Sequence, residues 1–334
     1  MASVTLSGHI KSQVKMTSTR DAYAVVMEAP RQLDWRCLPL AEPGPEDLVV
    51  RTRFSGISTG TERLFYTGEM PSFPGMGYPL VPGYETVGEV VQAGVATTGL
   101  SAGDLVFVPG ASCWGPVRGL FGGAGSSLVV PGARVVKIHE SIAEEAVLFA
   151  LAATAHHALM SPSGERVLPD LIVGHGALGR LLARITVALG GLPLVWELEP
   201  SRRTGATGYR VVDPLESKGQ RFKTIIDVSG HAPSLNDWVA HMAPGGELVL
   251  AGFYTETLPL NFVPAFLREA RFRVAAQWQP SDMIAVRDLV ESGGLSLQGL
   301  VTHRRPADQA AEAYEQAFSD PHCLKMVLDW RSLQ

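Results

Sequence analysis

A glycine-rich turn, GHGALG, begins at Gly174 and connects the apolar run LIV to the helical pattern RLLARITVALG. This order predicts a strand, a tight turn and a helix. Gly174 and Gly176 allow the turn and let the backbone approach a pyrophosphate, while Gly179 lets the helix pack closely on its strand. The first N–H groups of the helix, from Ala177 and Leu178, are suited to bind that anion.

A second apolar run, LVW, ends in Glu197, eighteen residues beyond Gly179. A carboxylate at that distance can accept hydrogen bonds from an adenosine ribose, so the pattern predicts a bound nicotinamide dinucleotide. Arg202 and Arg203 follow, and an arginine there could instead bind the 2′-phosphate of NADP. Because the carboxylate repels that phosphate, we favour NAD as the cofactor.

The elements that must hold this turn alternate between strand and helix from Asp170 onward, which predicts an α/β fold with a doubly wound parallel sheet of the Rossmann type. Residues 22–140 instead hold short β-type runs among glycines and prolines, and they predict a β-rich, barrel-like lobe. We expect a helix in the run AEEAVLFALAATAHHAL. The predicted division is 21–150 with 295–334 for the barrel-like catalytic domain, and 151–294 for the nucleotide-binding domain.

Composition narrows the classes of function. A chain of 334 residues is expected to form two lobes, and its net charge of −5 with a pI near 6.0 argues against nucleic acid as a partner. The three cysteines are far apart in the sequence, which is typical of a reduced, cytoplasmic protein. No apolar stretch approaches the length of a membrane span. Residues 1–20 lack the apolar block of a secretory signal, and we expect a mobile tail.

Several motifs give the chain a resemblance to the medium-chain dehydrogenase/reductase family: GISTGTE from Gly56, VPGYETVGEV from Val81, the GHGALG turn, DVSG from Asp227, and APGGELVLAG from Ala243. The resemblance covers residues 23–330. It implies a GroES-like barrel lobe beside the Rossmann sheet, and it implies that Ser229 and Thr154 lie near the cofactor. It also implies a possible homo-oligomer formed through the edge of the nucleotide-binding sheet, where FRVAAQW could serve.

More narrowly, the chain resembles the members of this family that oxidise the 3-(1-hydroxyethyl) group of a bacteriochlorophyllide to 3-acetyl in bacteriochlorophyll biosynthesis. The segments TGEMPSFPGMGYPLVPGYE, GLFGGAGSS and FALAATAHHAL carry this likeness. A tetrapyrrole would then be the substrate and NAD the hydride acceptor. The glycine- and proline-rich segment from Phe65 to Leu80 should be a loop, whose aromatic and methionine side chains suit a flat apolar ligand or serve ordinary packing.

The chain departs from the zinc-dependent members of the family at the metal ligands. The resemblance puts Ser58 and Ala150 at the positions of their two cysteines and Tyr84 at the position of their histidine. None of these three residues is a competent zinc ligand. His156 and His157 are adjacent, so on a helix they point about 100° apart and do not easily chelate one ion. We expect one of these imidazoles at the cleft edge and the other against the core. The prediction is an enzyme without a metal, since Glu62 and Glu85 alone would suit a weak hard-cation site at best.

Without zinc, another group must bind the substrate oxygen and lead its proton to solvent. Tyr84 is our first candidate, followed by Ser58 and Thr59, although these residues could also cap a helix or pack under the barrel. His156, two residues after Thr154, is a candidate proton relay because imidazole titrates near neutral pH. Two other functions remain open: a zinc-independent quinone or enone reductase that uses NADPH, and a non-catalytic nucleotide-binding protein.

Overall fold

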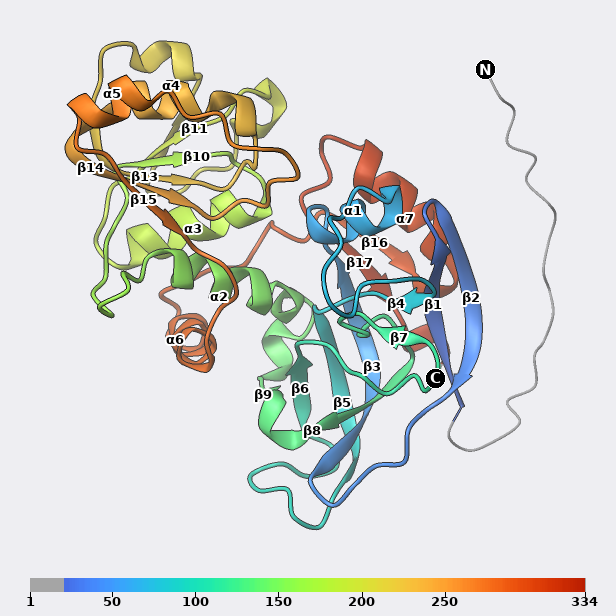
Figure 1. Ribbon diagram of the computed structural model, residues 1–334. Coiled ribbons are helices and arrows are strands. Elements are labelled where there is room, and N and C mark those ends of the chain that lie inside the picture. Colours follow the sequence, from blue (N-terminus) through green and yellow to red (C-terminus); the bar gives the residue numbers. More distant parts are fainter. Residues whose placement is uncertain (1–20, 334) are drawn as a thin grey trace.

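The computed structural model describes residues 21–333, which form two lobes joined side by side (Figure 1). The tail expected at residues 1–20 lies outside the described residues. One lobe holds the N-terminal and C-terminal segments, and the other holds the middle of the chain. Within residues 21–333, no helix combines the length and apolar character needed to cross a bilayer.

The first lobe is built from two β-sheets. The smaller sheet has the order β2-β1-β4-β7, with β1 (Asp21–Ala29), β2 (Gln32–Pro39), β4 (Leu80–Val81) and β7 (Arg118–Gly119). The larger sheet has the order β16-β17-β3-β5-β6-β9, and β8 (Ser127–Pro131) also pairs with β3. Its strands are β3 (Asp47–Ile57), β5 (Thr86–Ala93), β6 (Leu105–Val108), β9 (Val136–Lys137), β16 (His303–Pro306) and β17 (Met326–Asp329).

The larger sheet brings the end of the chain beside its beginning, as the sequence predicts. Strand β17 runs antiparallel to β3 and places Met326 opposite Ile57. Along the first half of β3, buried residues alternate with more exposed ones, which is the period of a strand with one face on a core. Helices α1 (Thr61–Thr67) and α7 (Ala310–Ser319) follow the segments that lead out of β3 and β16.

The second lobe is a six-stranded parallel sheet with the order β12-β11-β10-β13-β14-β15. Its strands are β10 (Leu171–Val173), β11 (Leu194–Trp196), β12 (Arg210–Val212), β13 (Phe222–Asp227), β14 (Met242–Leu250) and β15 (Arg271–Val274). The chain adds strands on one side of β10 and then returns to add β13 on the other. This reversal between β10 and β13 creates the crevice where open α/β sheets bind their ligands. The predicted fold class is therefore confirmed.

Helices cover both faces of this parallel sheet (Figure 1). The α2–α3 side includes α2 (Phe149–Ala158) and α3 (Ala177–Ala188), with α6 (Pro280–Glu291) packed on α2, and the other side includes α4 (Leu235–Ala240) and α5 (Phe262–Leu267). Side chains alternate accordingly, since Ile172 joins the core of α2 and α3 whereas Leu171 joins the core of α4. The segment between β11 and β12 forms a single 3₁₀ turn, Pro200–Arg202, in place of a longer crossover helix, and it contains Pro200, Gly205 and Gly208, which disfavour helix.

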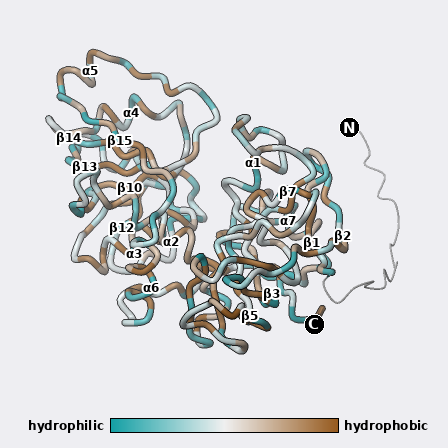
Figure 2. The backbone as a smooth tube through the Cα atoms, turned by 60° about the horizontal axis from the view of Figure 1, so that its bottom comes forward, coloured by the Kyte–Doolittle hydropathy of each residue, from teal (hydrophilic) through white to brown (hydrophobic). Residues whose placement is uncertain are grey.

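One apolar core crosses from lobe to lobe through α2. It joins Phe107 of the first lobe, Phe149 of α2 and Ile172 of the parallel sheet. Figure 2 shows hydrophobic backbone segments in both lobes. The helix predicted in this region begins later than expected, because residues Glu145–Leu148 form a 3₁₀ turn before α2 starts.

Candidate active site

The glycine turn between β10 and α3 has the geometry that its sequence predicts. Gly174 has a φ of 102°, a conformation that L side chains rarely adopt. A Cβ on Gly179 would lie 2.0 Å from the carbonyl oxygen of Gly174, so only glycine lets α3 approach the strand this closely. At Gly176, by contrast, a Cβ would meet no atom within 4 Å. The turn is therefore packed on its protein side and open in front of Gly176.

The N-terminus of α3 faces this opening. Gly176 is the N-cap of the helix, and no side chain caps the helix there. The N–H groups at the start of α3, which include those of Ala177 and Leu178, are thus left to bind an external acceptor. A helix of twelve residues adds partial positive charge at this end. The open space and the free donors together fit a pyrophosphate.

Glu197 lies directly after β11, and backbone groups hold its carboxylate. One carboxylate oxygen accepts a hydrogen bond from the N–H of His175 at 2.8 Å, and the other accepts one from the N–H of Glu199 at 2.8 Å. The acid predicted to bind ribose is therefore fixed beside the glycine turn.

The two arginines after Glu197 have other partners. Arg203 forms an ion pair with Asp213 at 2.6 Å. Arg202 donates to the carbonyl of Pro321, a residue that follows α7 in the first lobe. The structure thus places Arg202 at a contact between the two lobes.

Two polar residues that sequence reasoning did not single out brace the glycine turn. His175 is fully buried, and its ring nitrogens contact the carbonyl of Arg202 at 2.6 Å and the hydroxyl of Tyr209 at 2.8 Å. Burial lowers the pKa of His175 to about 4, which keeps this imidazole neutral at physiological pH. Arg180 donates to the carbonyls of His175 and Arg202. A polar residue inside the motif was the available signal for His175.

Ser229 lies in the loop after β13, across the reversal point from the glycine turn. Its hydroxyl donates to Asp227 at 2.6 Å, and a Cβ on Gly174 would come within 3.3 Å of the Ser229 nitrogen. Asp227 is fully buried, and burial raises the pKa of its carboxyl group. A cavity of about 160 Å³ lies next to this loop and is lined by Gly230, His231, Ala232, Pro233, Thr255 and Glu256.

In the first lobe, the structure brings Ser58 and Tyr84 together. Their hydroxyl oxygens lie 2.7 Å apart, although the residues are 26 positions apart in the sequence. Ser58 follows β3 and Tyr84 precedes β5, so the pairing of these two strands sets their distance. Burial raises the pKa of Tyr84, and the neighbouring Glu85 raises it further, which keeps the phenol protonated. Thr59 lies next to Ser58 and is partly exposed.

These residues do not cap the helix that follows them. The N-cap of α1 is Gly60, and no side chain makes a capping hydrogen bond there. The Ser58 hydroxyl is instead within hydrogen-bond distance of Tyr84. The helix-capping alternative for Ser58 and Thr59 is therefore wrong.

A buried carboxyl group, Glu62, lies beside the hydroxyl pair. Its side chain accepts hydrogen bonds from the N–H of Ser58 at 3.2 Å and from the hydroxyl of Tyr314 at 2.5 Å. Glu62 has no solvent exposure, and burial raises its pKa to about 7. The group can therefore change its protonation state near neutral pH. Sequence reasoning missed Tyr314, which lies 252 residues from Glu62.

A second buried acid, Glu85, forms an ion pair with Lys325. The ammonium lies 2.6 Å from one carboxylate oxygen and also donates to the carbonyl of Ile57 at 3.2 Å. Both side chains are at most 1% exposed. The pair also contacts Gly56, where a Cβ would lie 2.3 Å from the Glu85 carboxylate. The only signal for Lys325 was a lysine inside the strand-like run LKMVLDW.

The two histidines of α2 share one partner. His156 and His157 both contact Asp282 of α6, each at a different carboxylate oxygen, at 2.7 and 2.9 Å. The His156 side chain is buried, with 9% exposed, whereas that of His157 is 27% exposed, so one ring lies against the core as expected, and a position of the other at the cleft edge stays a prediction.

Thr154 donates to the carbonyl of Ala150, one turn earlier on α2. His156 lies about 200° further around the helix, and its ring contacts α6 rather than Ser58 or Tyr84. The structure therefore does not bring the proposed relay His156 to the hydroxyl pair. Among residues 21–333, no group of three or more histidines, cysteines and acids has a geometry that could hold a metal ion.

Comparisons with known proteins agree with this architecture. Residues 44–140 match the alcohol dehydrogenase GroES-like domain family. The 2-desacetyl-2-hydroxyethyl bacteriochlorophyllide A dehydrogenase of Cereibacter sphaeroides is 57% identical over 315 residues, which cover 92% of this chain and 98% of that relative.

Two solved structures share the fold at lower identity. An alcohol dehydrogenase of Escherichia coli CFT073 in complex with NADH has a TM-score of 0.78 at 23% identity, covering 93% of this chain and 99% of that one. A dehydrogenase of Sinorhizobium meliloti bound to NADP has a TM-score of 0.75 at 22% identity, covering 92% and 99%. With the glycine turn, the barrel lobe and a relative of this identity, the chain belongs to the medium-chain dehydrogenase/reductase family, whose members bind a nicotinamide cofactor.

Proposed function

We propose that this protein oxidises the 3-(1-hydroxyethyl) group of a bacteriochlorophyllide to 3-acetyl, with NAD as the hydride acceptor and without a catalytic zinc ion. The observation that carries the proposal is the 57% identity to the bacteriochlorophyllide dehydrogenase of C. sphaeroides over almost the full length of both chains. Ser58 and Tyr84 support the zinc-free part, because the family resemblance implies that they stand where zinc-dependent members carry a cysteine and a histidine, and their hydroxyl oxygens lie 2.7 Å apart.

The preference for NAD rests on the surroundings of Glu197. Its carboxylate is held by two backbone N–H groups and forms no ion pair with Arg202 or Arg203. A 2′-phosphate placed there would meet this negative charge, whereas a ribose diol can donate hydrogen bonds to it. Arg203 is already paired with Asp213.

Oxidation of the alcohol removes a hydride from carbon and a proton from oxygen. The bound nicotinamide supplies the acceptor for the hydride. In this proposal Tyr84 binds the alcohol oxygen, and the proton of the alcohol passes to Tyr84 as Tyr84 releases its own proton to Ser58, which lies 2.7 Å away and releases one in turn toward solvent. Tyr84 acts here as a neutral phenol, since burial opposes its ionisation. Glu62 holds the backbone of Ser58 in place by accepting a hydrogen bond from its N–H group.

We also propose that the protein works in the cytoplasm. Cys37, Cys113 and Cys323 are all free thiols in the structure. This usage is typical of a reducing compartment.

The test is an absorbance assay of the purified protein with a 3-hydroxyethyl bacteriochlorophyllide. With NAD, we expect a shift of the red absorption band as the conjugated acetyl group forms, and we expect the same rate after treatment with a chelator. Loss of activity on chelation would contradict the zinc-free mechanism. Reduction of quinones or enones by NADPH, without alcohol oxidation, would identify a reductase instead. NADH binding with no turnover of any of these substrates would identify a nucleotide-binding protein without this activity.

A further inference from the structure

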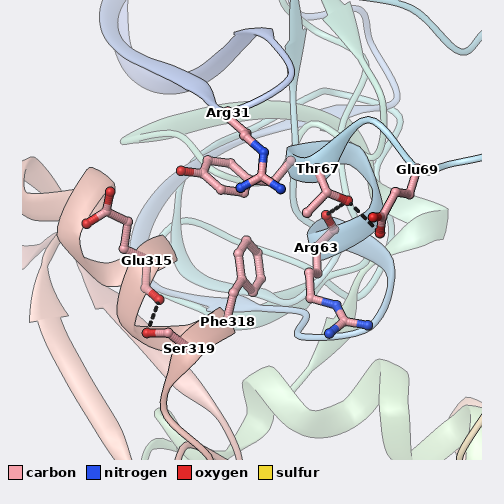
Figure 3. Close-up of a pocket in the computed structure, with 8 residues that line it drawn as sticks. Arg31, Arg63, Thr67, Glu69, Glu315, Phe318 and Ser319 are labelled. Atoms are coloured by element: carbon pink, nitrogen blue, oxygen red, sulfur yellow. Dashed lines mark hydrogen bonds between the residues drawn. The ribbon is translucent and has the colours of Figure 1, made fainter. Parts of the chain in front are cut away.

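A large pocket lies between α1 and α7, at the end of α1 remote from Ser58 (Figure 3). Its volume is about 730 Å³, which falls in the range of sites for small organic ligands. Three segments line it: the C-terminal part of α1, the C-terminal part of α7, and the turn between β1 and β2 that carries Arg31. The backbone N–H of Arg31 donates to the carbonyl of Tyr66 at 2.6 Å, which ties this turn to α1.

The pocket has an aromatic wall. The ring centroids of Tyr66 and Phe318 lie 5.4 Å apart, and the two ring planes are inclined to each other by 48°. Both side chains are only partly buried, so their ring surfaces remain available to a ligand. Aromatic walls of this kind favour flat apolar molecules, which can stack or make edge contacts with them.

Four charged side chains surround this wall. Arg31, Arg63, Glu69 and Glu315 are all exposed, and no ion pair within residues 21–333 joins any of them to another side chain. In Figure 3 the two acids lie on opposite sides of the pocket, and Glu69 accepts a hydrogen bond from the hydroxyl of Thr67 at 3.0 Å. The two guanidinium groups are therefore available to an external anion. A guanidinium binds a carboxylate through two parallel hydrogen bonds.

The pocket and the candidate active site are connected through α1 and α7. The ring of Phe318 packs on that of Tyr314, with 5.7 Å between the ring centroids. The hydroxyl of Tyr314 donates to Glu62, and Glu62 also accepts a hydrogen bond from the N–H of Ser58. Helix α1 has seven residues and is therefore about 10 Å long. The length of α1 is thus comparable with the breadth of a tetrapyrrole macrocycle.

We propose that the α1–α7 pocket binds the carboxylate-bearing side of the tetrapyrrole, with Arg31 and Arg63 pairing to the carboxylate and Tyr66 and Phe318 contacting the macrocycle. This inference rests on the proposed function. A bacteriochlorophyllide is an unesterified acid, so it carries one propionate carboxylate on a flat and otherwise largely apolar ring. The pocket thereby determines which edge of the macrocycle turns away from Ser58 and Tyr84, and it presents the hydroxyethyl edge to them.

The test compares the free acid with its propionate methyl ester on two proteins, the wild type and the double variant Arg31→Gln/Arg63→Gln. For the free acid, the double variant should raise KM about 10-fold or more with little change in kcat, because a charge-assisted contact made equally in the ground and transition states is lost. For the ester, the two proteins should have the same KM. Arg221→Gln, which removes an exposed arginine from the other lobe, serves as the matched control and should change neither value.

A second pair of variants tests the sign of the charge. Glu69→Gln and Glu315→Gln remove the two acids of the same pocket and should leave the KM for the free acid unchanged or lower. Binding is measured in parallel from the fluorescence polarisation of the pigment, so the comparison does not depend on turnover.

The outcomes separate this inference from the proposed function. The pocket does not bind the carboxylate if the wild type oxidises the acid and the ester with equal KM, or if the double variant raises the KM of both compounds to the same extent. The proposed function stands in either case. If the wild type oxidises neither compound, the proposed function fails. In that case the inference fails as well unless the double variant weakens binding of the acid and not of the ester.

Discussion

The Ser58–Tyr84 hydroxyl pair is enclosed by ionisable side chains that water does not reach. Glu62, Glu85 and Lys325 are at most 1% exposed. Charges in such surroundings persist only when they are paired or hydrogen-bonded, and Glu85 meets this condition through Lys325. Glu62 has no ion-pair partner among residues 21–333, so burial disfavours its carboxylate and raises its pKa, and the hydrogen bonds from Tyr314 and Ser58 offset only part of this rise.

The role of the hydroxyl pair can be tested by removing each oxygen. Tyr84→Phe should reduce kcat about 100-fold, the order of magnitude that a positioned proton-transfer group contributes. Ser58→Ala should reduce it as well, and the double variant should be little worse than Tyr84→Phe alone because the two oxygens act as one unit. Steady-state kinetics on the hydroxyethyl substrate provide the measurement. A Tyr84→Phe enzyme with wild-type kcat would exclude Tyr84 from the reaction.

Glu62 should make the stability of the protein depend on pH. Its pKa is about 7 in the folded state and near 4.5 when unfolded, so the folded state binds more protons between these values. Stability from this group is therefore fully present below about pH 4.5 and is lost as pH rises through 7, by about 3 kcal/mol in total.

The matched variant Glu62→Gln keeps an acceptor for Tyr314 and does not titrate. The difference in unfolding free energy between wild type and variant, measured in urea at pH 5 and pH 8, should move in favour of the variant as pH rises. An unchanged difference would show that Glu62 titrates near its ordinary pKa.

At the scale of elements, the glycine turn combines two different requirements. Gly179 is needed for the contact between α3 and β10, whereas the space in front of Gly176 is open. Sequence spacing predicted both glycines as parts of one motif. It could not distinguish their roles, because the distinction depends on which atoms of the folded chain lie beside each Cα.

This difference predicts that the same substitution affects stability at one position and cofactor binding at the other. Gly179→Ala should destabilise the fold strongly, since its Cβ would lie 2.0 Å from a backbone oxygen that cannot move independently. Gly176→Ala should leave the melting temperature almost unchanged but weaken dinucleotide binding, because its methyl group would occupy the opening above the helix N-terminus. Thermal unfolding and NADH fluorescence titration measure the two effects. Normal NADH affinity in a folded Gly176→Ala variant would place the pyrophosphate elsewhere.

Most strands could be predicted from short patterns. The β-type runs expected in residues 22–140 and the strands expected from Asp170 onward include β1, β3, β5 and β13, since alternating or continuous apolar residues between turn residues mark strands locally. Helix α6 and strand β8 were not predicted. Helix α6 is bounded by a Gln279–Asp282 capping box and buries only a narrow stripe against α2, so its apolar pattern is weak.

At the scale of the whole molecule, α2 and the Arg202–Pro321 contact hold the two lobes together. Strand β15 lies at the edge of the parallel sheet, with Phe272 and Val274 exposed by 41% and 73%. This edge includes the segment FRVAAQW that we expect to mediate self-association, and oligomer formation stays a prediction.

The loop expected between Phe65 and Leu80 is present from Gly68 to Pro79, after α1 ends at Thr67.

The sequence by itself determined the glycine turn, the acid at the end of the next strand, the parallel sheet and the family, because these depend on residues close together in the chain. The tertiary structure alone decided the partners of the buried groups: Tyr314 with Glu62, Lys325 with Glu85, and Asp282 with His156, which are 252, 240 and 126 residues apart. Such pairs form only when the C-terminal strand returns to β3 and α6 packs on α2, and no local pattern specifies these contacts.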